Sequence, residues 1–193
     1  MEKKLDISVI SPVFNELENL ETFVESVTEV MNSTNMSWEL IIVDDGSDDG
    51  SSKILKKIGR QENIRSILLS KNYGQTTAIQ AGFDNAVGEY FVTLDSDLQN
   101  DPKDIPALIQ KLINEELDLV VGWRKDRKDN YFFRNLPSIL ANKLIGTITG
   151  VKLHDYGCSL KAYRAEVLKE VKLYGEMHRF IPAWMATKIP ASK

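Results

Sequence analysis

The chain is poor in the residues from which disulfides and structural zinc sites are built. Its 193 residues include a single cysteine, Cys158, and two histidines, His154 and His178. One cysteine excludes an internal disulfide and favours a reducing compartment. So few histidine and cysteine side chains also argue against a structural zinc site.

The sequence also lacks long apolar runs and the common phosphate-binding motifs. No stretch reaches the roughly 18 apolar residues of a membrane span, and the opening MEKKLDISVISPVF has no secretion-signal core. Neither a Gly-x-Gly-x-x-Gly motif after the first expected strand nor a Walker A motif is present, which disfavours a dinucleotide or P-loop site. A net charge of −4 argues against nucleic acid as a partner. We expect this stretch of chain to be soluble by itself.

The apolar residues that are present alternate between strand-like and helix-like patterns, in a length that suits one domain. We expect strands at 7–10, 40–43, 64–69, 90–94 and 119–121. We expect helices at 20–31, 54–58, 76–86 and 102–112, the last capped by Asp101. This order predicts an α/β fold with a mostly parallel sheet and helices on both faces. Beyond Gly122 we expect a basic loop, a helix over 136–148, a compact segment at 154–164 and a short helix near Val167.

Two of the expected strands end in acidic clusters. Asp44 and Asp45 directly follow one strand, and Asp95 and Asp97 follow another. Because ligands of open α/β sheets bind outside the carboxyl ends of the strands, both clusters should face one edge. Such carboxylates suit Mg²⁺ or Mn²⁺ together with substrate phosphates. The alternative, in which acids cap helices or solvate turns, is favoured for the neighbouring acids Asp48, Asp49 and Asp101.

A run of basic residues follows the last expected strand. It contains Arg124, Lys125, Arg127, Lys128 and Arg134. This run is either a solvated surface loop or a phosphate clamp, since guanidinium groups bind phosphate through two parallel hydrogen bonds.

Several stretches resemble the family 2 glycosyltransferases of the GT-A (Rossmann-like) fold. They are ISPVFNE followed by ENL, IIVDDGSDDGS, NYGQTTAIQAGFDNAVGEYFVTLDSDLQNDP, DLVVGWRKDR and HDYGCSLKAYR. With Arg134 and Ser138 they are similar to the branch that loads a sugar onto polyprenyl or dolichyl phosphate. The resemblance runs in order from about residue 7 to residue 184.

The resemblance implies an inverting transfer of a sugar from a nucleoside diphosphate sugar, with uridine favoured, to a polyprenyl phosphate. It implies Mg²⁺ or Mn²⁺ held by Asp95, Asp97 and Gln99. It implies nucleotide contacts from Pro12, Asn15, Glu16, Asp44, Asp45, Lys71, Gly74, Asp95 and Ser96. It implies catalytic or acceptor-binding roles for Asp97, Asp155, Arg124, Arg134 and Ser138.

The same resemblance gives expectations for the whole chain. Residues 1–193 would form one catalytic domain, with about 1–123 binding nucleotide and metal and 124–193 facing the acceptor. Members of this branch usually continue into membrane segments, so we expect the chain to be truncated before them. The enzyme would work at the cytoplasmic side of a membrane, at the membrane surface, as a possible homo-oligomer.

Three other readings stay open. A truncated domain that binds a nucleotide sugar without turnover fits the same motifs. A sugar-phosphate nucleotidyltransferase is disfavoured because no Gly-rich basic loop follows the first strand. Transfer to a glycan hydroxyl is disfavoured by the Arg134 and Ser138 pair. For Asp155 alone, the alternative to a catalytic role is that of a turn acid before Gly157.

Overall fold

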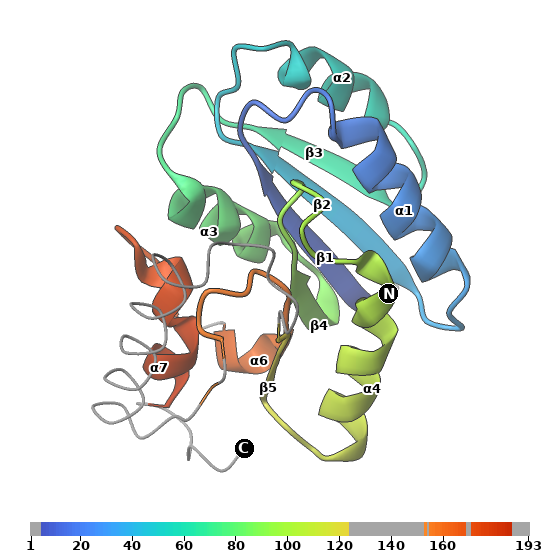
Figure 1. Cartoon of the computed structure of the whole chain (residues 1–193), viewed down its shortest axis with the longest axis vertical. Coiled ribbons are helices and arrows are strands. Elements are labelled where there is room, and N and C mark those ends of the chain that lie inside the picture. Colours follow the sequence, from blue (N-terminus) through green and yellow to red (C-terminus); the bar gives the residue numbers. More distant parts are fainter. Residues whose placement is uncertain (1–4, 124–152, 154, 169–170, 187–193) are drawn as a thin grey trace, which may run out of the picture.

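A six-stranded sheet flanked by helices forms the body of the protein (Figure 1). The computed structural model describes residues 5–123, 153, 155–168 and 171–186. The strands are β1 (Leu5–Val13), β2 (Trp38–Asp44), β3 (Ile64–Leu68), β4 (Gly88–Thr93), β5 (Leu119–Val121) and β6 (Lys161–Arg164). The helices are α1 (Leu20–Asn32), α2 (Ser51–Ile58), α3 (Gln75–Asn85), η1 (Pro102–Asp104), α4 (Ile105–Asn114), α6 (Ala165–Leu168), η3 (Met177–Phe180) and α7 (Ile181–Met185).

The strand order is β3-β2-β1-β4-β6-β5, and the four strands from β3 to β4 pair in parallel. The mostly parallel sheet is therefore confirmed. The last expected strand, β5, pairs with β6, which was not predicted; β6 lies between β4 and β5 and runs antiparallel to both. The strand β6 was not predicted because three of its four residues are buried, so no alternation of polar and apolar residues indicates a strand there.

Helices cover both faces of the sheet, as expected. On one face α1, α2 and α4 bury their apolar sides against alternate strand residues such as Val9 and Leu40. On the other face α3, α6 and α7 pack against the intervening residues, such as Ile10 and Ile41 (Figure 1). The period of two along each strand thus separates two cores. The helix expected from residue 102 opens with the single 3₁₀ turn η1 before α4 begins.

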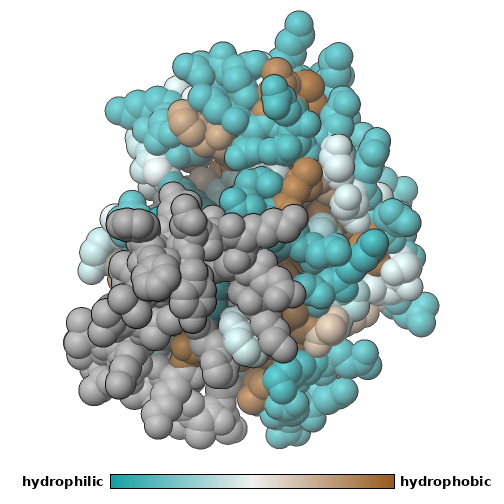
Figure 2. Space-filling view, viewed as in Figure 1, coloured by the Kyte–Doolittle hydropathy of each residue, from teal (hydrophilic) through white to brown (hydrophobic). Residues whose placement is uncertain are grey.

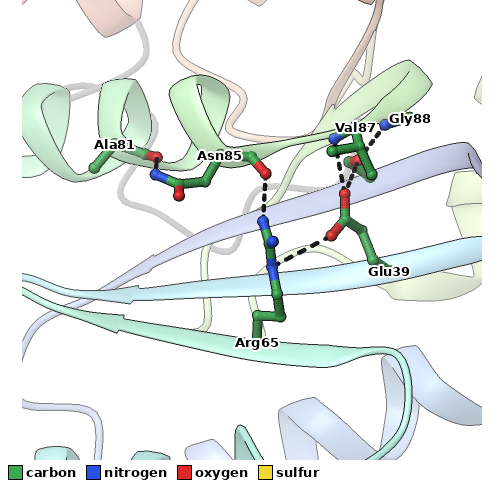
Figure 3. Close-up of polar contacts among 7 residues, drawn as sticks. Glu39, Arg65, Ala81, Asn85, Val87 and Gly88 are labelled. Carbon is green, nitrogen blue, oxygen red and sulfur yellow. Dashed lines mark hydrogen bonds and ion pairs between the residues drawn. The ribbon is translucent and has the colours of Figure 1, made fainter. Parts of the chain in front are cut away.

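A buried carboxylate ties the amino-terminal edge of the sheet together. Glu39 on β2 is 5% exposed and accepts hydrogen bonds from Ser8 Oγ at 2.6 Å and Val87 N at 2.9 Å. Its other oxygen lies 3.5 Å from Arg65 Nε, and the Arg65 guanidinium also donates to Asn85 O at the end of α3 (Figure 3). This network joins three strands to α3 at the edge away from the acidic strand ends.

The described residues include no helix both long enough and apolar enough to cross a membrane. On the face drawn in Figure 2, their surface is mostly hydrophilic and carries separate hydrophobic patches. The expected loop at 124–131 and helix at 136–148 lie outside the described residues. Because β6 comes from the part expected to face the acceptor, both parts of the chain contribute to one sheet.

Candidate functional site

A cleft of about 280 Å³ opens at the carboxyl ends of β1, β2 and β4. The parallel register brings these ends together, since Val13 pairs with Asp44 and Ile10 pairs with Thr93. Residues predicted to contact nucleotide or metal line the cleft, namely Pro12, Glu16, Asp45, Gly74, Asp95, Ser96 and Asp97. The structure therefore brings together residues that are up to 85 positions apart (97 − 12) in the sequence.

One wall of the cleft depends on Asp45. Its side chain is buried, and its two oxygens accept hydrogen bonds from Tyr73 N and Gly74 N, each at 2.8 Å. Gly74 has φ of 95° and directly precedes α3, a backbone conformation that favours glycine. Asp45 thereby fixes the amino terminus of α3 against the cleft, where the helix dipole favours a negatively charged ligand.

Asp44 lies one residue earlier but turns inward. It is 0% exposed, and its carboxylate accepts hydrogen bonds from Ser47 N at 3.1 Å, Ser47 Oγ at 2.5 Å and Ser52 Oγ. The structure does not place Asp44 among the residues that line the cleft. In this arrangement Asp44 organises the turn after β2, and its predicted contact with the nucleotide stays a prediction.

Asn15 and Lys71 also support the loops around the cleft instead of lining it. Asn15 joins the β1 loop to the β2 loop, because its side chain exchanges two hydrogen bonds with Asp48 at 2.9 and 3.0 Å. Gly46 in that β2 loop has φ of 73°, and a Cβ there would lie 2.3 Å from the backbone carbon of Lys71. The β2 loop therefore approaches the backbone at Lys71 so closely that only glycine fits at position 46.

The Asp-x-Asp stretch follows β4 on the opposite side of the cleft. Asp95 Oδ1 accepts a hydrogen bond from Gln75 Nε2 at 2.8 Å, and Asp95 N donates to Ser159 Oγ at 3.3 Å. Burial, followed by the negative charge of Asp97, raises the pKa of the Asp95 carboxyl above its usual value. Two carboxylates that repel each other in a partly buried site are suited to a divalent cation.

Gln99, the third predicted metal ligand, is exposed, and its backbone N donates to Asp97 Oδ1 at 3.1 Å. Leu98 between them has φ of 60°, a conformation uncommon for a leucine. Across the described part of the chain, no three acidic, histidine or cysteine side chains gather as metal ligands. The metal site predicted at Asp95, Asp97 and Gln99 therefore stays a prediction, in which ligand phosphates would add further oxygens.

A second cleft, of about 320 Å³, adjoins the first and shares Gln75 and Asp95 with it. Its other walls include Lys161 on β6 and His178 and Arg179 on η3. None of these three residues, nor Gln75, was predicted from the sequence to belong to the site. Lys161 lies on the strand that the sequence pattern did not reveal, and η3 lies far along the chain, so no local signal marked them.

Asp155 occupies a turn close to this second cleft. It is 6% exposed and its Oδ1 accepts a hydrogen bond from Gly157 N at 3.0 Å. Tyr156 and Gly157 line the cleft, so Asp155 shapes the turn that carries them. The remaining predicted catalytic residues, Arg124, Arg134 and Ser138, lie outside the described residues.

Solved structures share this fold. A glucosyl-3-phosphoglycerate synthase from Mycobacterium tuberculosis superposes with a TM-score of 0.65 and 21% identity, over 85% of this chain and 58% of that one. A mannosyltransferase from Pyrobaculum calidifontis superposes with a TM-score of 0.62 and 17% identity, over 96% of this chain and 51% of that one. These are GT-A glycosyltransferases, which confirms the expected fold class.

Sequence relatives are closer. The chain is 54% identical over 193 residues to dodecaprenyl-phosphate galacturonate synthase from Rhizobium johnstonii, across 99% of this chain and 57% of the relative. It is 40% identical to undecaprenyl-phosphate 4-deoxy-4-formamido-L-arabinose transferase from Salmonella choleraesuis, across 95% of this chain and 58% of the relative. The chain thus spans little more than half the length of these relatives. The profile described as Glycosyl transferase family 2 matches residues 8–172, and the chain belongs to that family.

Proposed function

We propose that the protein transfers a sugar from a nucleoside diphosphate sugar, with uridine favoured, to a polyprenyl phosphate. The observation that carries this proposal is the meeting of Asp95 and Asp97 with the Asp45–Gly74 wall in one cleft at the sheet edge. Both curated relatives are named for polyprenyl-phosphate substrates or products. The neighbouring structures were solved with UDP, with Mn²⁺ and UDP-glucose, and with GDP-mannose and Mn²⁺.

The residues present fit a divalent metal ion. Asp95 and Asp97 would hold Mg²⁺ or Mn²⁺, which supplies neutralisation of the charge that grows on the departing diphosphate. The raised pKa of Asp95 supports this fit, because a nearby cation would relieve the repulsion from Asp97 that contributes to it. Gln75 Nε2 donates to Asp95 Oδ1 and so orients the carboxylate that would bind the ion.

The chain's own residues would position both substrates. Pro12, Glu16 and Ser96 line the cleft that receives the nucleotide, and the amino terminus of α3 faces its phosphates. Arg124, Arg134 and Ser138 are proposed to hold the acceptor phosphate in line with the anomeric carbon. Such placement can supply a large share of the reduction in barrier, and a single displacement inverts the anomeric configuration.

No strong general base is needed for this reaction. The second pKa of a phosphate monoester lies near 6, so the acceptor is largely dianionic at pH 7 and its oxygen attacks without prior deprotonation. Asp155 already accepts a hydrogen bond from Gly157 N. We therefore assign Asp155 to positioning the turn beside the second cleft.

The two relatives are named for different sugars. One relative is named for galacturonate, which carries a carboxylate, and the other for a formamido-arabinose, which is uncharged. The acceptor and the reaction class are common to both names, whereas the charge of the sugar is not.

A transfer assay tests the proposal and separates it from the alternatives. The protein is incubated with Mn²⁺, a polyprenyl phosphate and a panel of UDP-sugars, and lipid-linked sugar and released UDP are measured by mass spectrometry. The proposal predicts equal amounts of both products, and neither with Asp97→Asn. Pyrophosphate release from UTP and a sugar phosphate would favour a nucleotidyltransferase, and nucleotide binding without any product would favour a non-catalytic domain.

A further inference from the structure

We propose that His178 is a positioning residue, which as a neutral imidazole fastens residues 171–186 to α3 and orients Arg179 at the wall of the second cleft. Residues 171–186, which contain η3 and α7, are called the strap below. The effect on sugar transfer rests on the proposed function. The link between His178 and α3 does not, because it is present in the protein without substrates.

The strap packs along one side of α3 (Figure 1). Leu173, Ile181 and Met185 of the strap belong to the same buried core as Ile79 and Phe83 of α3. Apolar packing of this kind is non-directional, so the orientation of the strap on the helix depends on its polar contacts.

Polar contacts join the strap to α3 at Thr76, Gln80 and Asp84. These three residues are four positions apart and therefore lie on the same side of the helix. Gln80 Oε1 accepts a hydrogen bond from Leu173 N at 2.7 Å, and Asp84 Oδ1 lies 3.2 Å from Lys172 Nζ. The ion pair is exposed and contributes little stability.

The contact at Thr76 is made by His178, which is 9% exposed. Its Nδ1 lies 2.6 Å from Thr76 Oγ1, and its Nε2 accepts a hydrogen bond from Arg179 Nε at 3.3 Å. Because a guanidinium donates hydrogen bonds and accepts none, Nε2 carries no proton; Nδ1 therefore carries it and donates to Thr76. Both bonds form together only while the imidazole is neutral.

These two bonds connect the strap to the predicted metal site. Thr76 directly follows Gln75, whose Nε2 donates to Asp95 Oδ1 at 2.8 Å. The first turn of α3 thus orients a predicted metal ligand through one side chain and holds the strap through the next. Arg179 and Asp95 line the second cleft together. Since both proposed substrates are anions, the direction of a guanidinium in this cleft affects how they bind.

Protonation of His178 would break this arrangement, because a proton on Nε2 would point at the Nε–H of Arg179. Burial, followed by the positive charge of Arg179, lowers the pKa of His178. Among the other charged groups, Glu176 before η3 raises this pKa and Lys161 on β6 lowers it. The remaining titratable groups that line the cleft with His178 are Asp95, Tyr156 and Tyr163.

The lowered pKa of His178 makes the link depend on pH in one direction. The neutral histidine contributes stability that is fully present above its unfolded pKa of about 6.5 and is lost as the pH falls through the folded value. We therefore expect the strap to be held at about pH 7.5 and to loosen toward about pH 5, where Arg179 also loses its acceptor.

Hydrogen–deuterium exchange followed by mass spectrometry measures this link in the protein without substrates. Protection factors, which correct for the intrinsic effect of pH on exchange, are compared at the two pH values for strap peptides and for β2. The strand β2 is buried throughout and lies between β1 and β3, so it reports unfolding of the whole domain. We expect strap protection to fall about tenfold more than that of β2, as for the loss of one hydrogen bond to a charged group.

Variants separate the proton from the packing. In His178→Gln the side-chain oxygen can accept from Arg179, but the amide does not titrate, so strap protection should no longer fall at the lower pH. Thr76→Val removes the acceptor of Nδ1–H and should lower strap protection even at the higher pH. The matched control is Thr77→Val, since Thr77 is exposed in the same turn and its hydroxyl donates to Tyr73 O; it should behave as the unmodified protein does.

Sugar transfer provides the second readout. Between the same two pH values, kcat/KM of the unmodified protein should fall more steeply than that of His178→Gln. Asp95, whose pKa is raised, titrates in both proteins, so its contribution cancels in this comparison.

The outcomes separate this inference from the proposed function. Strap protection that followed that of β2 at both pH values, or a pH dependence that persisted in His178→Gln, would show the link to be wrong and leave the proposed function standing. Identical pH profiles of transfer in the two proteins would overturn the role of the link in catalysis. Absence of transfer with every UDP-sugar would overturn the proposed function, and the exchange of the strap would still decide whether His178 fastens it.

Discussion

Gln75 gives the most quantitative prediction about the metal site. Its Nε2 donates to Asp95 Oδ1 at 2.8 Å, from the first residue of α3. A hydrogen bond to a charged acceptor contributes about 1.5–3 kcal/mol, which corresponds to roughly 10- to 150-fold in an equilibrium constant. Loss of a group that orients a metal ligand typically costs about 10- to 100-fold in metal affinity. Both estimates predict that Gln75→Ala weakens Mn²⁺ binding at least about tenfold.

The assay is a titration of Mn²⁺, followed by electron paramagnetic resonance, with UDP held at saturation. Gln110→Ala provides a matched control, since Gln110 is exposed on α4 and does not line either cleft at the sheet edge. We expect the control to bind Mn²⁺ as the unmodified protein does. Mn²⁺ affinity of Gln75→Ala within twofold of the unmodified protein would refute the reasoning, because Asp95 would then not depend on its partner.

Three further predictions concern the strand ends and their supports. Folding raises the pKa of Asp95, so this carboxyl contributes stability below its unfolded pKa that is lost as the pH rises through the folded value. Asp95→Asn should therefore stabilise the metal-free protein at pH 7, by a margin that shrinks at lower pH. Urea unfolding in the presence of EDTA measures this difference. Glu39→Ala leaves the buried Ser8 hydroxyl and Val87 N–H without their acceptor and should lower the free energy of unfolding by about 2–4 kcal/mol. Glu39→Gln should lower it by less, and equal decreases for the two variants would contradict this account. Gly46→Ala should destabilise the protein more than Gly175→Ala. Both glycines have positive φ, which costs an alanine about 1–2 kcal/mol, but only at Gly46 would the new Cβ also clash with the backbone of Lys71. Thermal unfolding of the two variants provides the comparison.

The sequence predicted those parts of the fold that local patterns encode. The strands from β1 to β4 and their helices have clear periods, and acids directly after buried strands predicted a site at the carboxyl edge, where the cleft lies. The turn roles favoured for Asp49 and Asp101 also agree with the structure, where each accepts a backbone N–H two residues later, from Ser51 and Lys103.

The remainder depends on contacts between distant segments. β6 is short and largely buried, so it has no pattern of its own, yet it carries Lys161 into the second cleft. The different partners of Asp44 and Asp45 could not be predicted from two adjacent identical residues. Which of them turned inward depended on Ser47 and Ser52 on one side and on Gly74 on the other.

The most direct test of the central claim is a calorimetric titration of UDP and GDP into the protein, with Mn²⁺ and with EDTA, beside Asp97→Ala. The account predicts that one nucleotide, UDP, binds only when both Mn²⁺ and Asp97 are present. Nucleotide binding that is unchanged by EDTA and by Asp97→Ala would contradict the two-carboxylate metal site. Failure of both nucleotides to bind a folded sample would contradict the assignment of the cleft itself.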